Sequence, residues 1–270
     1  MSGLLIRSSR RFEEIEGKHL ALVIGTNLFV AVIPLMIVGF AVIEGFSSHE
    51  TVGTVVVEAF HLTGSTAVTV DRTFASASAG RSVALSISVL SLVITGYDIS
   101  ETVQLAYARA FRMAPLRGLR KYLRGATWLV LLLITTGVSL SLRYLMASQP
   151  GVVAVLGVLG ILALNFGFFL MTPRLLLDLP FSWGDLVRGA LVSTAAAVVV
   201  HLVTDFELHQ WFREYSEAYG AFGIGLALMA AVALTATFWV WIAAVMGVYW
   251  EGEVGAAAVE RMERLSAHHG

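Results

Sequence analysis

The sequence contains no cysteine and has few charged residues. Of its 270 residues, only 14% are charged, and the net charge is −1. The missing cysteine excludes disulfides, thiolate metal sites and a cysteine nucleophile. The charge balance excludes the broad basic surface with which nucleic-acid-binding proteins neutralise phosphates. What remains is a chain that is 57% hydrophobic, well outside the usage of soluble globular proteins.

Catalytic and metal-binding patterns are also missing from the sequence. The seven histidines form no cluster that could hold metal ions for hydrolysis, and no Gly-rich phosphate loop is present. Serine, histidine and aspartate occur, but not at a spacing that assembles a catalytic triad. We therefore expect no enzyme, no metal site, no cofactor and no nucleic-acid partner.

Long apolar runs dominate the chain and predict membrane-spanning helices. A helix needs about 20 apolar residues to cross a bilayer core. Six runs come close to this length or exceed it: 19–46, 82–111, 125–146, 152–171, 186–203 and 221–249. Residues 47–80 and 205–219 are amphipathic and predict helices on the outer surface. The predicted fold class is therefore all-α, a polytopic membrane protein with six transmembrane helices and outer amphipathic helices.

The distribution of Lys and Arg predicts the orientation of these spans. If both termini are cytoplasmic, 14 of the 18 Lys and Arg residues lie inside and 4 lie outside. The opposite orientation reverses this ratio, against the positive-inside rule. We predict three parts: a cytoplasmic amphipathic segment at 1–18, a six-helix membrane domain at 19–250 and a cytoplasmic tail at 251–270.

The second run, 82–111, carries polar residues at a depth where they are costly. They are Tyr97, Asp98, Glu101 and Gln104. The two carboxylates lie one helical turn apart, roughly 15 Å from the basic end of the run. An aspartate at the bilayer centre costs about 2.5 to 3.5 kcal/mol, so these carboxylates should not both face lipid.

This cost predicts how the second span is rotated. We expect its polar face to turn into the bundle, towards Asn27 of the first span or Asn165 of the fourth. The opposite face, which includes Val93, Ile99 and Val103, should make the more apolar contacts. Two uses of the polar face stay open. It could line a substrate or proton pathway, because neighbouring carboxylates can share a proton, or it could be internal polar packing.

A basic run follows the second span. Its members are Arg109, Arg112, Arg117, Arg120, Lys121 and Arg124. Such a run anchors the cytoplasmic end of a span, and it could also bind anionic lipid headgroups. Arg174, beside Pro173 and four residues before Asp178, could form a surface salt bridge or meet a lipid phosphate, which arginine binds in a bidentate way.

Several short motifs, in this order along the chain, resemble the YihY/BrkB family of bacterial inner-membrane proteins. They are the polar N-terminal helix before a first span with Pro34, the region of Tyr107, Leu179-Pro180 through Trp183, Gly189-Ala190, and Tyr219 to Gly223. The family usually ends its last span in a Gly-Ala-Glu-like sequence, where this chain reads Met246 to Glu251. The resemblance is therefore to a divergent branch.

The resemblance implies a multi-pass protein of the bacterial cytoplasmic (inner) membrane, with export of an envelope lipid or glycolipid among the roles proposed for the family. Two hypotheses follow. The first is transport or flipping of an amphipathic envelope component through a polar intramembrane cavity. The second is a structural or assembly protein that transports nothing. In both, membrane lipids are the partners, and a homo-oligomer is left open.

Overall fold

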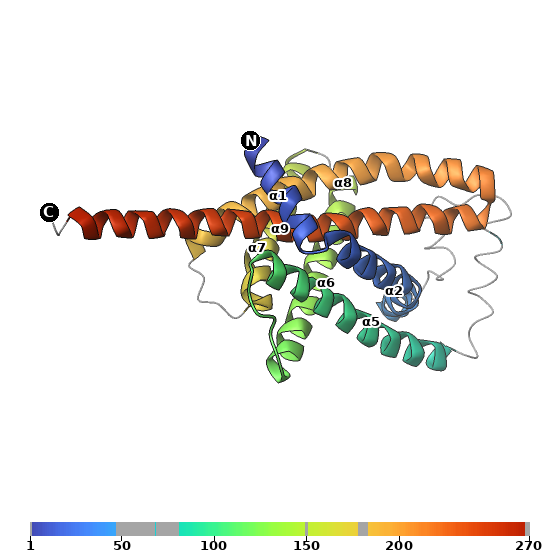
Figure 1. Cartoon of the computed structure of the whole chain (residues 1–270). Helices are drawn as coiled ribbons and strands as arrows, with labels where there is room; N and C mark the ends of the chain where they lie inside the picture. Colours follow the sequence, from blue (N-terminus) through green and yellow to red (C-terminus); the bar gives the residue numbers. More distant parts are fainter. Residues whose placement is uncertain (1, 47–67, 69–80, 149–150, 178–182, 268–270) are drawn as a thin grey trace.

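The structure, a computed structural model, describes residues 2–46, 68, 81–148, 151–177 and 183–267. The helices are α1 Ser2–Glu14, α2 Gly17–Phe46, α5 Arg81–Ala110, α6 Leu119–Ser148, α7 Val152–Leu176, α8 Trp183–Tyr219 and α9 Ala221–Ala267 (Figure 1). No strand occurs within the described ranges. The predicted all-α class is confirmed.

Five helices contain apolar stretches long enough to cross a membrane. These stretches are Gly17–Gly39, Val83–Ala110, Leu119–Met146, Val152–Leu176 and Gly225–Gly252. They correspond to five of the six predicted spans and confirm a polytopic membrane protein. The remaining predicted span, the fifth in chain order, lies in α8, whose apolar stretch Leu186–Leu202 is shorter. The count of six crossings and the three-part division of the chain stay predictions.

Two predicted helix boundaries are wrong, and a third predicted segment lies almost entirely outside the described residues. The sequence predicts a separate surface helix at 205–219, whereas α8 runs unbroken from Trp183 to Tyr219. It predicts a third span from residue 125, whereas α6 begins at Leu119 and includes half of the basic run. No proline interrupts either junction, so the helix continues from the apolar into the polar stretch. The amphipathic segment 47–80 lies outside the described residues, apart from Val68.

Helix α9 runs through the middle of the molecule and contacts α1, α2, α5 and α8. Figure 1 shows α8 and α9 side by side over much of their length. Small residues bring the helices together. A Cβ on Gly25 would lie 3.5 Å from the Cβ of Ala236, and Gly247 lies directly against the carbonyl of Ala110. Lipid gives helices no hydrophobic reason to associate, so close packing at small residues holds them together.

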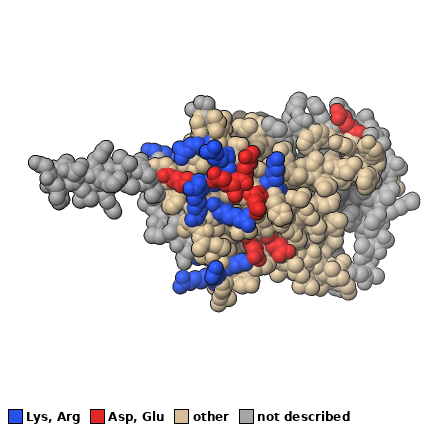
Figure 2. All heavy atoms as spheres, in the orientation of Figure 1, with Lys and Arg blue, Asp and Glu red and all other residues tan. Residues whose placement is uncertain are grey.

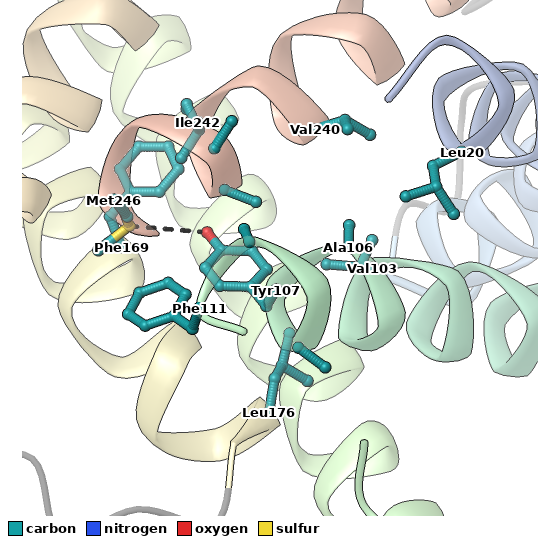
Figure 3. Close-up of a cluster of buried hydrophobic side chains, with 14 of the residues drawn as sticks. Leu20, Val103, Ala106, Tyr107, Phe111, Phe169, Leu176, Val240, Ile242 and Met246 are labelled. Atoms are coloured by element: carbon teal, nitrogen blue, oxygen red, sulfur yellow. Dashed lines mark hydrogen bonds between the residues drawn. The ribbon is translucent and has the colours of Figure 1, made fainter. Parts of the chain in front are cut away.

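The C-terminal half of α5 packs into a buried apolar cluster (Figure 3). Tyr107 is 3% exposed, and its hydroxyl donates a hydrogen bond to the sulfur of Met246 on α9 at 3.8 Å. On the other side, Leu20 of α2 lies beside Val103 and Ala106. The cluster therefore fixes the rotation of α5 and decides which of its residues face the bundle.

Helices α6 and α7 form a hairpin that packs mainly on itself. Gly157 of α7 lies against the Met146 side chain of α6, and Gly160 lies against Leu142. In Figure 1, α6 runs across the direction of α8 and α9. Tyr144 and Val152 are 78% and 75% exposed. The exposed apolar faces of this hairpin are not covered by other described helices, so in a monomer they contact lipid.

Charged residues gather at the end of the molecule from which the last turns of α9 extend (Figure 2). Arg11 of α1 bonds both to the Ala110 carbonyl at the end of α5 and to Glu251 of α9. The N-terminal helix, the end of α5 and the point where α9 leaves the apolar region therefore lie on one side. This agrees with the predicted placement of both termini in the cytoplasm.

Candidate functional site

Glu101 is neutralised by a residue from the neighbouring helix. Lys121, in the first turn of α6, forms a salt bridge with its carboxylate, and the Tyr97 side chain also interacts with that carboxylate. The Lys121 ammonium lies 5.9 Å from the centre of the Tyr97 ring, which stacks on Tyr122 at 5.2 Å. Four side chains from α5 and α6 thus form one polar cluster at the helix crossing.

The crossing of α5 and α6 places this cluster. A Cβ on Gly125 would overlap the Ser100 hydroxyl, and a Cβ on Gly96 would lie 3.4 Å from Leu129. The two helices therefore meet about half a turn on either side of Asp98, well inside the apolar stretch of α5. Because α6 begins on the cytoplasmic side, its basic first turn reaches Glu101, and the long lysine side chain spans the remaining depth.

Asp98 faces outwards, and the predicted rotation of α5 is wrong for this residue. It is exposed, whereas Ile99 and Val103, predicted for the outer face, are each 4% exposed. The structure gives the Asp98 carboxylate no ion pair with any described residue. Its neighbour one turn earlier, Ile94, is 56% exposed, so the carboxylate lies beside an apolar side chain on the outer surface of α5.

The other predicted polar residues are spread over different places. Gln104 is 2% exposed, as predicted for this position, and its Nε2 has no hydrogen-bond partner among the described residues. Asn165 donates to the Ile161 carbonyl of its own helix at 2.9 Å, which satisfies the amide within α7. Asn27 is half-buried. The structure does not bring Asn165 and the acidic pair together by any hydrogen bond among the described residues.

Asn27 nevertheless lies at the level of Asp98. Leu20 of α2 lies beside Val103 and Ala106 of the antiparallel α5 (Figure 3). Asn27 is seven residues, or about 10 Å, further along α2. Seven residues back along α5, from Val103 and Ala106 towards its N-terminus, lie residues 96 to 99. Polar groups of two adjacent helices therefore occur at one depth.

The interior next to this site is apolar. A cavity of about 10 Å³ lies between α5, α6, α7 and α9, among Val103, Tyr107, Trp128 and Trp239. A cavity of this volume holds at most a single water molecule. Trp128 donates its indole N–H to the Thr172 hydroxyl at 3.2 Å, so the polar atoms here satisfy one another. The cavity is too small and too apolar for a lipid headgroup, and it does not supply the predicted polar pathway.

The basic residues predicted as anchors bind protein groups in most cases. Arg109 pairs with Glu16 at 2.7 Å, and Arg124 donates to the Leu177 carbonyl at the end of α7 at 3.0 Å. Arg174 stacks over the Trp183 ring at 3.8 Å, and its predicted partner Asp178 lies outside the described residues. Arg117 and Arg120 are exposed.

Sequence reasoning missed a ring of four charged residues on the cytoplasmic side. Arg11 pairs with Glu251 at 2.6 Å and with Glu14 at 3.2 Å, and Arg112 pairs with the same two glutamates at 3.4 and 3.3 Å. The four residues come from α1, α9 and the turn after α5. An arginine in a short polar helix gives no signal of this kind, because its partner Glu251 is 240 residues away.

Within the described ranges, no group of three or more histidine, aspartate or glutamate side chains could hold a metal ion. The polar chemistry of the site consists instead of one outward carboxylate, one neutralised carboxylate and two stacked phenols. These groups can exchange protons and hydrogen bonds with a polar headgroup. They do not form a nucleophile and base pair.

Comparison with known proteins identifies the family. The family model described as Virulence factor BrkB matches residues 8–266, nearly the whole chain. No curated protein and no solved structure matches the chain. Together with the apolar helices, the family match shows a multi-pass protein of the bacterial cytoplasmic membrane. The predicted resemblance is confirmed, and the chain belongs to the BrkB family.

Proposed function

We propose that this membrane protein moves an amphipathic envelope lipid or glycolipid across the cytoplasmic membrane, with the headgroup travelling along the outer face of α5. The observation that carries the proposal is the exposed carboxylate of Asp98 near the middle of the apolar stretch Val83–Ala110. An unpartnered aspartate at this depth is costly, by about 2.5 to 3.5 kcal/mol at the bilayer centre. A polar headgroup that pairs with it offsets this cost.

A line of polar residues along α5 supports such a route. Ser91, Asp98, Thr102 and Arg109 follow one another at spacings of seven, four and seven, which keeps them on one face of a helix. Asp98 and Arg109 are exposed, and Ser91 and Thr102 are half-buried. The line extends over about 27 Å, which is close to the thickness of the hydrocarbon core.

The open surface of α5 and α6 allows the acyl chains to stay in the bilayer while a headgroup follows this line. Beyond the crossing at Gly96, both helices present apolar side chains to lipid. Ile87 and Leu90 of α5 are 63% and 61% exposed, and Leu133 of α6 is 58% exposed. A route along the surface needs no interior cavity for the headgroup, which agrees with the small volume of the cavity beside Trp128.

The test is lipid movement in vesicles of phosphatidylethanolamine and phosphatidylglycerol that contain a trace of fluorescent lipid. A membrane-impermeant reductant bleaches only the label in the outer leaflet, which is about half of the total. It bleaches the remaining label only if the protein moves lipid between the leaflets. We expect nearly all label to be bleached with the unchanged protein and the Glu214→Gln control, an exposed acid on α8. Asp98→Asn should slow bleaching of the inner-leaflet label at least tenfold. Equal rates for Asp98→Asn and the control would remove Asp98 from the route.

A structural or assembly role is the second candidate, and it is favoured by the way polar groups satisfy one another. Glu101 is paired with Lys121, Asn165 bonds within its own helix, and Trp128 bonds Thr172. In this case no lipid moves in the vesicles with any variant. A second copy of the chain would then cover Asp98, and cross-linking from position 98 would yield dimers.

A further inference from the structure

The ring of four charged residues connects three parts of the chain that are far apart in the sequence. Arg11 and Glu14 belong to α1, Arg112 follows α5, and Glu251 belongs to α9. The Arg11 side chain is 5% exposed and also donates to the Ala110 carbonyl at 2.7 Å. Two arginines and two glutamates balance one another, so the ring has no net charge.

The side of α1 that faces the bundle is mainly polar, and the ring contacts α1 at Arg11 and Glu14, in its last turns. An amphipathic helix usually buries its apolar side. Here the buried residues are Ser8 and Arg11, at 0% and 4% exposure, while Leu5 and Ile6 are 55% and 69% exposed. Charge-assisted hydrogen bonds are strong but depend on every partner being present. Loss of one charge therefore weakens the hold on this part of α1.

The turn that follows α1 is fixed to the bundle by apolar contacts. Ile15 is 2% exposed, and the half-buried Phe12 packs against the core beside the ring members Arg11 and Glu14. Glu16 follows with φ 58°, and a Cβ on Gly17 would overlap the Phe12 ring. Glu16 also pairs with Arg109 of α5. The turn at Glu16 and Gly17 is thus a fixed point about which the rest of α1 can swing.

Backbone strain occurs at two of the charged residues that make these contacts. Glu16 and Arg112 are the non-glycine residues with positive φ in the part of the chain that the structure describes, at 58° and 54°. Arg112 ends α5 in a Schellman motif, in which the Met113 N–H bonds to Ala108 and the Arg112 N–H bonds to Arg109. Glycine normally takes this position, because a side chain strains it. The ion pairs offset that strain only while α1 is docked.

We propose that residues 2–14 form a detachable strap that the four-residue ring holds across the cytoplasmic ends of α5 and α9. When the ring loses a charge, the strap swings away about Glu16 and Gly17 and withdraws the half-buried Phe12 from the core, while the membrane helices stay folded. Release removes the hydrogen bond from Arg11 to the Ala110 carbonyl and allows the strained backbone of Arg112 to relax. The strap therefore controls how firmly the end of α5 is linked, through Arg11, to Glu251 of α9. This inference is independent of the proposed lipid transport.

The sequence contains no cysteine, so two cysteines can carry spin labels on the full-length protein without removing native ones. Ser9→Cys and Gly252→Cys place the labels on exposed residues of α1 and α9 outside the ring. Pulsed electron paramagnetic resonance then measures the distance between labels in lipid nanodiscs. The test variant is Glu251→Gln, and the control is Glu13→Gln, an exposed acid of α1 outside the ring.

We expect one narrow, short distance in the unchanged protein and in Glu13→Gln. In Glu251→Gln, a longer and broader distance should appear, with its population raised about tenfold because charge-assisted bonds are lost. An unchanged distance in folded Glu251→Gln would overturn the proposal. If that variant does not fold, Arg112→Gln, at a side chain that is 63% exposed, decides instead. A raised population at the longer distance in Arg112→Gln supports the strap, and its absence contradicts it.

Discussion

Lys121 allows Glu101 to remain in a membrane-spanning helix. The glutamate side chain is 43% exposed and the lysine 23%, so the pair is only partly shielded from the surroundings. Asp98, one turn away, has no such partner among the described residues, although the sequence shows the two carboxylates as equivalent. The difference arises from α6, whose first turn crosses α5 on the side of Glu101.

The hydrogen bond between Trp128 and Thr172 gives a prediction at the residue scale. Trp128 is 1% exposed, so without its acceptor the indole N–H would be buried and unsatisfied. Thr172→Val should lower the free energy of unfolding by about 1 to 3 kcal/mol. Unfolding in mixed micelles, followed by tryptophan fluorescence, measures this change.

Thr194 of α8 provides the matched control for this substitution. Its hydroxyl is buried and donates only to the Ala190 carbonyl of its own helix, which already accepts a helical hydrogen bond. Thr194→Val should therefore change stability by less than about 0.5 kcal/mol. Equal losses for both variants would show that the bond from Trp128 contributes nothing specific.

The close approach of α5 to α9 gives a prediction at the element scale. A Cβ on Gly247 would lie 2.3 Å from the Ala110 carbonyl oxygen and 2.7 Å from its carbon, and backbone atoms cannot rotate away. Gly247→Ala should push the helices apart and destabilise the protein by about 1 to 3 kcal/mol. Gly252→Ala is the control, because its Cβ would meet no atom within 4 Å. Thermal unfolding of the two variants should differ clearly, and matching midpoints would refute the close contact.

The helices themselves were largely predictable from sequence, whereas their rotation was not. Apolar length alone predicts α2, α5, α7 and α9, because a bilayer requires it. The rotation of a helix cannot be predicted in the same way, because lipid is as apolar as the inside of the bundle. The sequence therefore does not distinguish Ile99, which faces the bundle, from Ile94, which faces outwards. The sequence predicted the residue types of the site and their depth along α5. It did not predict the outward direction of Asp98, because that direction depends on the rotation of α5.

The continuation of helices into polar sequence shows a second limit at the element scale. Hydropathy ends the fifth predicted span near 203, yet α8 continues to Tyr219. Hydropathy marks where a helix meets the headgroups, and only a turn residue or a cap marks where it ends. No local sequence pattern predicts the ring around Arg11. Its four members come from α1, α9 and the turn after α5, and they meet only in the folded chain.

At the scale of the whole molecule, one side is charged and tied together by ion pairs, while the membrane region has open apolar surfaces. The cytoplasmic ends of α1, α5 and α9 are joined around Arg11. Away from that side, α5 and the hairpin of α6 and α7 face lipid over most of their surface. This asymmetry is why we place lipid movement on the surface of α5 instead of inside the bundle.

The outward direction of Asp98 is the claim on which the proposed route depends, and site-directed spin labelling tests it directly. A nitroxide is attached at Asp98→Cys and, for comparison, at Val103→Cys in separate samples of the protein in lipid nanodiscs. Oxygen, which dissolves in the hydrocarbon, relaxes labels that face lipid. We predict strong relaxation and high mobility at position 98 and little of either at position 103. A label at 98 that is as immobile and protected as the one at 103 would show that this face is buried and would contradict the surface route.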